Sequence, residues 1–284
     1  MTSLVPVWQC GQFELKFDLP AIMAIINVTP DSFSGDGLSG SIEASLRQAE
    51  LALSNGARIL DVGGESSRPG SESVSVEQEL ERVIPVVEAL VQLGAPVSVD
   101  TVKPEVMCAA IAAGATIIND INALRAPGAI DVVAASDAGV CLMHMQGQPR
   151  SMQQAPSYDD VVAEVDAFLL ERCAALESAG VRRSRVALDP GFGFGKSLEH
   201  NLRLFRGMPL VNAHGYPLLV GVSRKTMLGA VTGRAVNERM PASIVTAVLA
   251  AQRGASILRV HDVAATRDAL AMWAAIEHDR LNAY

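Results

Sequence analysis

The sequence has 284 residues, of which 49% are hydrophobic and only 4% are aromatic, and its formal net charge is -8. This length and apolar content can bury a large core and fit one large α/β barrel or two ordinary domains, while the scarcity of aromatic residues argues against an all-β sandwich or a platform for stacked nucleic-acid bases. The negative charge opposes attraction to phosphate backbones and anionic lipids, so we expect neither nucleic acid nor membrane as a partner, although a small anion needs only a local site.

Short apolar segments alternate with helical patterns along nearly the whole chain. After an alternating segment that predicts a hairpin at 8–19, we expect strands at 21–27, 57–63, 96–100, 116–119, 140–144, 185–189, 217–222 and 256–260. Helical periodicity follows each strand, at 42–54, 76–92, 104–113, 129–136, 158–178, 198–205, 241–253 and 264–279. Glycines are predicted to close five of the helices and prolines to open two: Gly56, Gly114, Gly139, Gly180, Gly254, Pro104 and Pro241.

Eight strand-then-helix units predict a closed (β/α)₈ TIM barrel. Strands that are apolar on both faces belong in a parallel sheet covered by helices, and no linker interrupts the pattern. We therefore expect one domain over residues 1–284, with an N-terminal extension at 1–20 whose hairpin caps the bottom of the barrel.

Cysteine usage indicates a reducing compartment. Cys10, Cys108, Cys141 and Cys173 form no CxxC pair, and we interpret all four as small buried residues. The first eight residues lack the features of a signal peptide, and no apolar run is long enough to span a membrane. The sequence thus predicts a soluble, cytoplasmic protein.

Polar residues stand where the predicted strands end. In a TIM barrel these carboxyl ends form the floor of the active site, so we expect the polar ends to meet at one mouth. They are Asn27, Asp61, Asp100, Asn119 with Asp120, His144, Asp189, Ser223 with Arg224 and Lys225, and Arg259 with His261. His144 is either a buried core histidine or a part of this ring.

Two long loops follow the first two strands. Residues 27–37 carry Asp31, Phe33 and Asp36, and we interpret them as a lid, the alternative being an ordinary turn that caps the next helix. Residues 63–70 combine glycines and hydroxyls with Arg68, a donor set that suits an anion; a flexible linker is the alternative.

The remaining motifs suggest a ring-shaped ligand with an anionic group. Residues 189–196 look like a phosphate loop, but the carboxylate comes first and the spacing is wrong, so we interpret Asp189 as an acceptor for a ligand N–H edge. Cations after strands seven and eight, Lys225 and Arg259, occupy a frequent phosphate site of this fold. The substrate is predicted to be a flat nitrogenous ring carrying phosphate.

The motifs, taken in order, resemble the dihydropteroate synthase family. The resemblance rests on residues 27–34, 61–66, 68–70, 98–100, 118–120, 189–193, 223–225 and 259–261. It implies a barrel, commonly dimeric, that joins (7,8-dihydropterin-6-yl)methyl diphosphate to 4-aminobenzoate, releases diphosphate and is inhibited by sulfonamides.

The resemblance also implies roles for individual residues. Asp100, Asn119, Asp189 and Lys225 would hold the pterin, and Asn27 would contact Mg²⁺. The diphosphate would be bound by Ser67, Arg68, and the segment Arg259, Val260 and His261, and the aminobenzoate pocket would be lined by Phe33, Pro69, Lys225 and Thr226. Asp36, Lys225, Arg259 and His261 are the expected catalytic residues, with Mg²⁺ and the arginines serving the leaving group and Asp36 serving the developing cation.

Two departures and three rivals qualify this interpretation. Ser67 stands where the family usually has Thr, and Thr226 where it usually has Ser, and we expect these changes to affect sulfonamide affinity more than activity. The rivals are a pterin-dependent methyltransferase with a corrinoid partner, a pterin binder without activity, and an aldolase that uses Lys225 as a Schiff base. Ile244, Val248 and Leu249 on a late helix are either dimer contacts or barrel packing.

Overall fold

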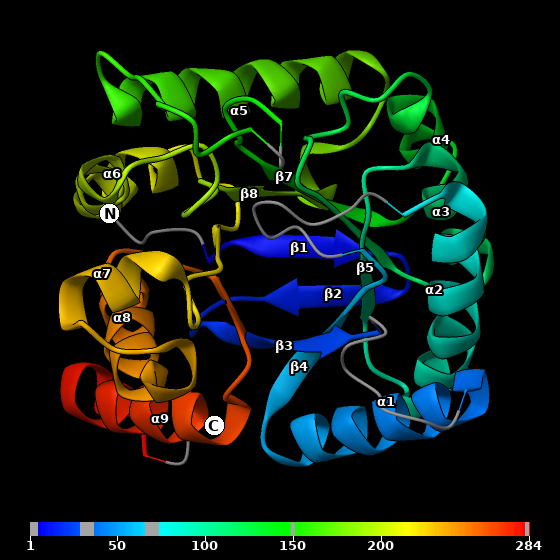
Figure 1. Cartoon of the computed structure of the whole chain (residues 1–284), viewed down its shortest axis with the longest axis horizontal. Coiled ribbons are helices and arrows are strands. Elements are labelled where there is room, and N and C mark those ends of the chain that lie inside the picture. The colour runs from blue at the N-terminus through cyan, green and yellow to red at the C-terminus, as the bar shows by residue number, and fades with distance from the viewer. Residues whose placement is uncertain (1–4, 29–36, 66–73, 149–150, 282–283) are drawn as a thin grey trace.

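Eight parallel strands form the centre of the molecule, for which a computed structural model describes residues 5–28, 37–65, 74–148, 151–281 and 284 (Figure 1). The strands are β3 (Ala21–Asn27), β4 (Ala57–Gly63), β5 (Val97–Asp100), β6 (Ile117–Asp120), β7 (Gly139–Met143), β8 (Val186–Asp189), β9 (Leu219–Val220) and β10 (Ile257–Val260). They are hydrogen-bonded in the order β8-β7-β6-β5-β4-β3-β10-β9. A parallel bridge between Leu188 and Leu218 joins the two ends of this order, so the sheet closes and the predicted barrel is confirmed.

Helices surround the strands on all sides (Figure 1). They are α1 (Gly37–Ser54), α2 (Val76–Leu90), α3 (Pro104–Ala112), α4 (Ala129–Ala134), α5 (Val161–Ser178), α6 (Leu198–Asn212), α7 (Thr226–Thr232), α8 (Met240–Gln252) and α9 (Val263–His278), with 3₁₀ turns at Val91–Leu93, Arg183–Arg185 and Val236–Glu238. Helix α7 was not expected, and α6 continues to Asn212 with Pro209 inside it, beyond the predicted end at 205.

The predicted hairpin closes the bottom of the barrel. Strands β1 (Val7–Cys10) and β2 (Phe13–Lys16) pair antiparallel. Trp8 is fully buried, and its indole N–H donates to the carbonyl of Arg185 at 2.9 Å. Trp8 and Cys10 share one apolar cluster with the starts of the barrel strands, including Met23, Ile59 and Ile257. The hairpin therefore plugs the end of the barrel opposite the carboxyl ends of the strands.

Gly139 does not close a helix, contrary to expectation. Gly56, Gly114, Gly180 and Gly254 have left-handed φ angles at their helix ends, whereas Gly139 is the first residue of β7 and is not left-handed. A Cβ atom on Gly139 would lie 2.6 Å from the sulfur of Cys10. This glycine is needed because the hairpin passes against it.

One of the four cysteines also differs from the prediction. Cys10, Cys141 and Cys173 are buried, and all four are free thiols, but Cys108 is exposed on α3. A helix that covers a barrel turns one face to solvent, and Cys108 lies on that face, so its small size did not determine its burial. No helix among the described residues is long and apolar enough to cross a membrane.

Candidate active site

Carboxylates from two strands, β4 and β5, converge on one guanidinium group at the mouth of the barrel. Arg259, on β10, donates from Nε to Oδ2 of Asp61 at 2.6 Å and from Nη2 to Oδ2 of Asp100 at 2.9 Å. Asn119, on β6, donates from Nδ2 to Oδ1 of Asp61 at 3.4 Å. The structure thus brings together strand-end residues far apart in the sequence, as the barrel prediction requires.

Burial sets the charges in this cluster. It raises the pKa of Asp100 to about 7, against the opposing pull of Arg259 and with the help of the Asp61 carboxylate. Burial also opposes the charge of Arg259, but Asp61 and Asp100 outweigh that effect and raise the pKa of Arg259 above its usual value. Arg259 is therefore a permanent cation, while Asp100 changes its proton near neutral pH and can accept a ligand N–H when it is ionised.

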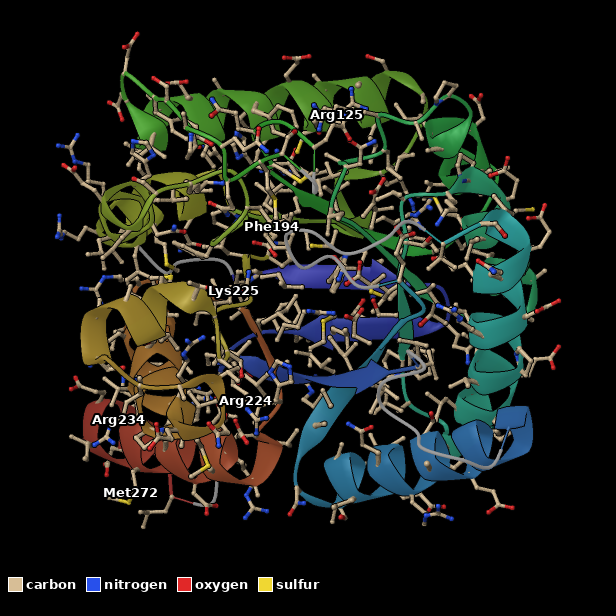
Figure 2. All side chains as sticks on the ribbon, in the orientation of Figure 1. Arg125, Phe194, Arg224, Lys225, Arg234 and Met272 are labelled. Atoms are coloured by element: carbon tan, nitrogen blue, oxygen red, sulfur yellow. The ribbon has the colours of Figure 1, made fainter. Side chains whose placement is uncertain are left out.

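A second acid and cation lie on the opposite side of the mouth. Asp189, buried at the end of β8, accepts the N–H of Gly191 at 2.7 Å. The Nζ of Lys225 donates to the carbonyl of Phe192 and lies 4.6 Å from the centre of the Phe194 ring (Figure 2). Burial raises the pKa of Asp189, against the opposing effect of Lys225, and lowers the pKa of Lys225 to about 8, against the opposing effect of Asp189.

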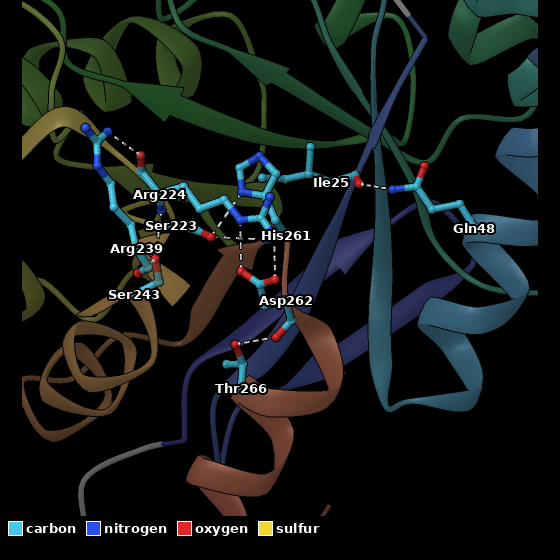
Figure 3. A network of polar contacts seen from close by, with 9 residues as sticks. All are labelled: Ile25, Gln48, Ser223, Arg224, Arg239, Ser243, His261, Asp262 and Thr266. Atoms are coloured by element: carbon cyan, nitrogen blue, oxygen red, sulfur yellow. Dashed lines mark hydrogen bonds and ion pairs between the residues drawn. The ribbon is translucent and has the colours of Figure 1, made fainter. Parts of the chain in front are cut away.

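A polar network ties the loop after β9 to the loop after β10 (Figure 3). Ser223 accepts the backbone N–H of His261 at 3.2 Å and lies 3.0 Å from its Nδ1. Arg224 donates to both oxygens of Asp262, at 3.0 and 2.5 Å. The network holds His261 beside the strand ends. The side chain of Arg224 stabilises the two loops by binding Asp262.

Arg224 needs that support because its φ is +58°, a left-handed value that is unusual for a residue with a side chain. Its backbone N–H donates to the hydroxyl of Ser243 at 2.9 Å, and its carbonyl accepts from Nη1 of Arg239 at 3.1 Å. Hydrogen bonds at its backbone N–H and at its carbonyl therefore stabilise the turn that precedes Lys225.

Other predicted site residues have varied positions. Val260 is buried on β10, and Thr226 is exposed as the first residue of α7. Asn27 ends β3 beside Gly63, at the same mouth, but its side chain lies outside the described part of the chain. The other predicted loop residues are also outside it: Asp31, Phe33, Asp36, Ser67, Arg68 and Pro69.

Asp120 does not join the polar ring at the mouth as expected. Its two oxygens accept the backbone N–H groups of Asn122 at 2.6 Å and Leu124 at 2.8 Å. Successive side chains of a strand point to opposite faces, so Asn119 and Asp120 point to opposite sides of the barrel wall. Asp120 shapes the turn after β6. His144 is buried and lies 2.9 Å from the Nζ of Lys196, as a core histidine with a partner.

An apolar wall beside Asp189 was missed in the sequence. Ile121, Met143, Met145 and Met152 form a small buried cluster, with Val102 and Phe194 packed against it. Met143 is paired in register with Asp189, so this wall adjoins the acid. A flat ring can be held between such a wall and the polar floor. Met143 ends an apolar run that at the sequence level looks the same as core, and the other members are single apolar residues among polar residues and glycines, so no pattern marks them.

Comparisons with known proteins agree with this geometry. A family model described as "Pterin binding enzyme" matches residues 23–261. The dihydropteroate synthase of Escherichia coli (strain K12) is 50% identical over 257 residues, which cover 90% of this chain and 91% of that protein. This chain belongs to the dihydropteroate synthase family.

Solved dihydropteroate synthases also share the fold. The Xanthomonas albilineans enzyme with 4-aminobenzoic acid is 51% identical, with a TM-score of 0.91, and the match covers 97% of this chain and 99% of that one. The Yersinia pestis enzyme with a sulfonamide drug complex is 43% identical, with a TM-score of 0.90, over 95% of this chain and 98% of that one.

Proposed function

We propose that this chain is a dihydropteroate synthase. The amine nitrogen of 4-aminobenzoate attacks the methylene carbon of (7,8-dihydropterin-6-yl)methyl diphosphate. The bond from that carbon to oxygen breaks, diphosphate leaves with the electron pair, and the amine loses a proton. The observation that carries the proposal is the position of buried Asp189 near the Lys225 ammonium at one mouth, in a chain whose relatives over most of its length are dihydropteroate synthases.

The hydrogen-bond donors and acceptors at the mouth match those of a pterin ring. A pterin presents an amino group and a ring N–H on one edge and a carbonyl beside them. Asp189 and Asn119 suit that edge, Lys225 suits the carbonyl, and Asp100 accepts a further ring N–H when ionised. Ile121 and Met143 supply the apolar contact for the ring face.

The leaving group needs positive charge, and Arg259 supplies it. A guanidinium has five N–H groups, and the bonds to Asp61 and Asp100 use two of them, so three remain for diphosphate oxygens. His261 lies in the neighbouring loop and is the second proposed diphosphate ligand, with Ser67 and Arg68 from the loop after β4. The nucleophile is the substrate's own amine, so no covalent enzyme intermediate is required.

A magnesium ion is part of the proposal as a companion of the diphosphate. Within the described ranges no group of three or more His, Cys, Asp or Glu could hold a metal. Mg²⁺ commonly takes one or two protein oxygens and fills its other positions with phosphate oxygens and water, so an amide oxygen of Asn27 and the diphosphate fit as donors. When bound, the ion neutralises charge on the departing diphosphate.

Sulfonamides and oligomerisation complete the proposed function. A sulfonamide resembles 4-aminobenzoate and should compete for its pocket, which we place at Lys225, Thr226, Phe33 and Pro69.

We further propose a homodimer, because apolar side chains are exposed over α7, α8, α9 and the turn between α7 and α8. They are Val231, Val236, Met240, Val245, Leu249, Met272 and Ile276. The four free thiols support a reducing compartment, and we propose the cytoplasm.

Diphosphate release tests the function directly. Purified protein is given the pterin diphosphate and Mg²⁺, with and without 4-aminobenzoate, beside an Asp189→Asn variant. We expect release that requires 4-aminobenzoate, and a loss of roughly 10- to 100-fold in kcat/KM for the variant, because a hydrogen bond to a charged group contributes about 1.5–3 kcal/mol. Tight pterin binding without any release would contradict the synthase and favour a methyltransferase or a binder without activity.

A further inference from the structure

The glycine-rich segment 189–196 ends in a buried lysine that the proposed mechanism does not use. Lys196 is only 2% exposed, although lysine is among the residues least often buried. Its Nζ donates to the carbonyls of Gly191 at 2.9 Å and Phe194 at 3.1 Å. The ammonium thus sits inside the loop to which it belongs, between β8 and α6.

The third partner of Lys196 comes from another element. Nδ1 of His144, which follows β7, lies 2.9 Å from the Nζ of Lys196. Burial, together with the charge of Lys196, lowers the pKa of His144 to about 3, so the ring is neutral. Burial also lowers the pKa of Lys196 to about 7, against the opposing effect of Asp189. Nδ1 is then the acceptor and Nε2 carries the proton. The contact fastens the loop to the end of β7.

The backbone fits tightly around this contact. Gly191 has a φ of +70°, and a Cβ there would lie 1.8 Å from the carbonyl oxygen of His144. Gly195 has a φ of +60°, and its Cβ would lie 2.3 Å from the carbonyl oxygen of Gln146. The two glycines allow the loop to pack closely against the segment after β7. At this contact the Nζ of Lys196 bonds both to the loop and to His144.

The same loop carries the atoms that orient the proposed pterin ligands. The N–H of Gly191 donates to Asp189, the carbonyl of Phe192 accepts from Lys225, and the ring of Phe194 lies under the Lys225 ammonium. Carbonyls of one short loop are therefore shared between two lysines, one structural and one at the mouth. A shift of this loop would move both Asp189 and Lys225.

We infer that Lys196 is a positioning residue for pterin binding: its buried ammonium, held by His144 and by the loop carbonyls, fixes the 190–196 loop so that Asp189 and Lys225 face the pterin. This inference rests on the proposed function. Lys196 touches no substrate and acts only through the loop.

The test compares Lys196→Met with a matched variant at the other end of the barrel. Arg185 is also a buried cation held by backbone carbonyls, with Nε and Nη2 donating to Ala138 at 2.9 and 2.7 Å and Nη2 donating to Val133 at 2.8 Å. Both Lys196→Met and Arg185→Met remove a buried basic group that donates to backbone carbonyls, and both should lower the Tm.

Only Lys196→Met should weaken the binding of the pterin. We expect its KM and directly measured Kd for the pterin diphosphate to rise at least about tenfold, with a smaller change in kcat, while Arg185→Met keeps the wild-type values. A wild-type Kd in Lys196→Met, or an equal rise in Arg185→Met, would overturn the inference.

A second pair of variants covers the case in which Lys196→Met does not fold. His144→Asn keeps an acceptor near the position of Nδ1, and His144→Leu removes it. The asparagine variant should keep the wild-type KM for the pterin diphosphate, and the leucine variant should have a higher KM. Equal KM values in both variants would refute the positioning role, whereas a wild-type protein that releases no diphosphate would refute the proposed function itself.

Discussion

The protonation of Lys225 predicts how activity depends on pH. Burial lowers the pKa of Lys225 to about 8, so the side chain is an ammonium below that pH and a neutral amine above it. The pterin carbonyl requires a strong donor, and kcat/KM for the pterin diphosphate should therefore fall above about pH 8. Because kcat/KM reports the free enzyme, the midpoint of this decline, the alkaline limb of the pH profile, should lie near the pKa of Lys225 in the unliganded site.

A Lys225→Arg variant provides the control for this limb. Arginine keeps its charge far above pH 8, so the variant should lose the alkaline limb even if its maximum is lower. The measurement is kcat/KM between pH 6 and pH 10 for both proteins. A wild-type profile that stays flat to pH 10 would show that Lys225 does not need its charge.

The ion pair between Arg224 and Asp262 predicts an effect on activity from residues that touch no substrate. Asp262→Asn removes the charge that holds Arg224 at its left-handed φ, so the turn before Lys225 loses its main side-chain support. We expect kcat/KM to fall about tenfold, which corresponds to about 1.4 kcal/mol. Steady-state kinetics measures the loss.

Asp268→Asn is the matched control for Asp262→Asn. Asp268 lies on α9 and pairs with Arg267 at 2.8 Å, but its side chain is exposed and distant from the mouth in the fold. An exposed pair of this kind contributes little, so this variant should keep wild-type kinetics. Equal losses in the two variants would mean that the Asp262 effect is not specific to the turn.

The sequence predicts which residues stand at strand ends but not how they pair. Asp61, Asp100 and Asn119 are recognisable because a polar residue ends an apolar run. The contacts of Asp61 and Asp100 with Arg259, and of Asn119 with Asp61, depend on the closure of the barrel, and Asp61 was consequently not assigned a role in the site. The partner of Arg224 could not be predicted either, because nothing local to Arg224 in the sequence indicates that Asp262 pairs with it.

At the scale of elements, the hairpin should contribute to stability and not to catalysis. Trp8 is fully buried at the bottom of the barrel, opposite the mouth, and bonds to the carbonyl of Arg185. Trp8→Ala should lower the free energy of unfolding by about 3–5 kcal/mol, through lost burial and the cavity left behind. Denaturant unfolding measures the change, and kcat at a temperature where the variant is folded should be unaltered.

Gln9→Ala is the control on the same strand. Within the described residues the side chain of Gln9 has one hydrogen bond, to exposed Glu14 at 2.6 Å, so its removal should change stability by less than about 0.5 kcal/mol. A Trp8→Ala variant that is as stable as Gln9→Ala would show that the hairpin is not part of the core. A large loss of kcat in folded Trp8→Ala would show that the two ends of the barrel are coupled.

Element boundaries were predictable where a local signal decides them. Ser75 caps α2 through its side chain, Pro104 opens α3, and Gly56 and Gly114 follow helix ends. Helix α7 was missed because its seven residues, from Thr226 to Thr232, are too few for helical periodicity. Gly139 was misassigned because its reason is a contact with Cys10, which is distant in the sequence.

At the scale of the whole molecule, the proposed dimer must overcome charge. Each chain carries a net charge of -8, so two copies repel one another at long range. Burial of an apolar face can offset this repulsion, and exposed apolar side chains gather on α8 and α9, where Val245 is 59% exposed, Met272 61% and Ile276 73%. We therefore expect a dimer that weakens at low ionic strength, where repulsion is least screened.

Charge placed on that face should separate the copies. Val245→Glu combined with Met272→Glu would bury two carboxylates in each half of the interface, a cost that an apolar contact does not repay. Sedimentation should show a dimer for the wild type and a monomer for this variant, with unchanged far-UV circular dichroism. Leu51→Glu, at a residue 63% exposed on α1, is the control and should remain dimeric. If the wild type sediments as a monomer at micromolar concentration, the exposed face of α8 and α9 has another role, and the proposed dimer is wrong.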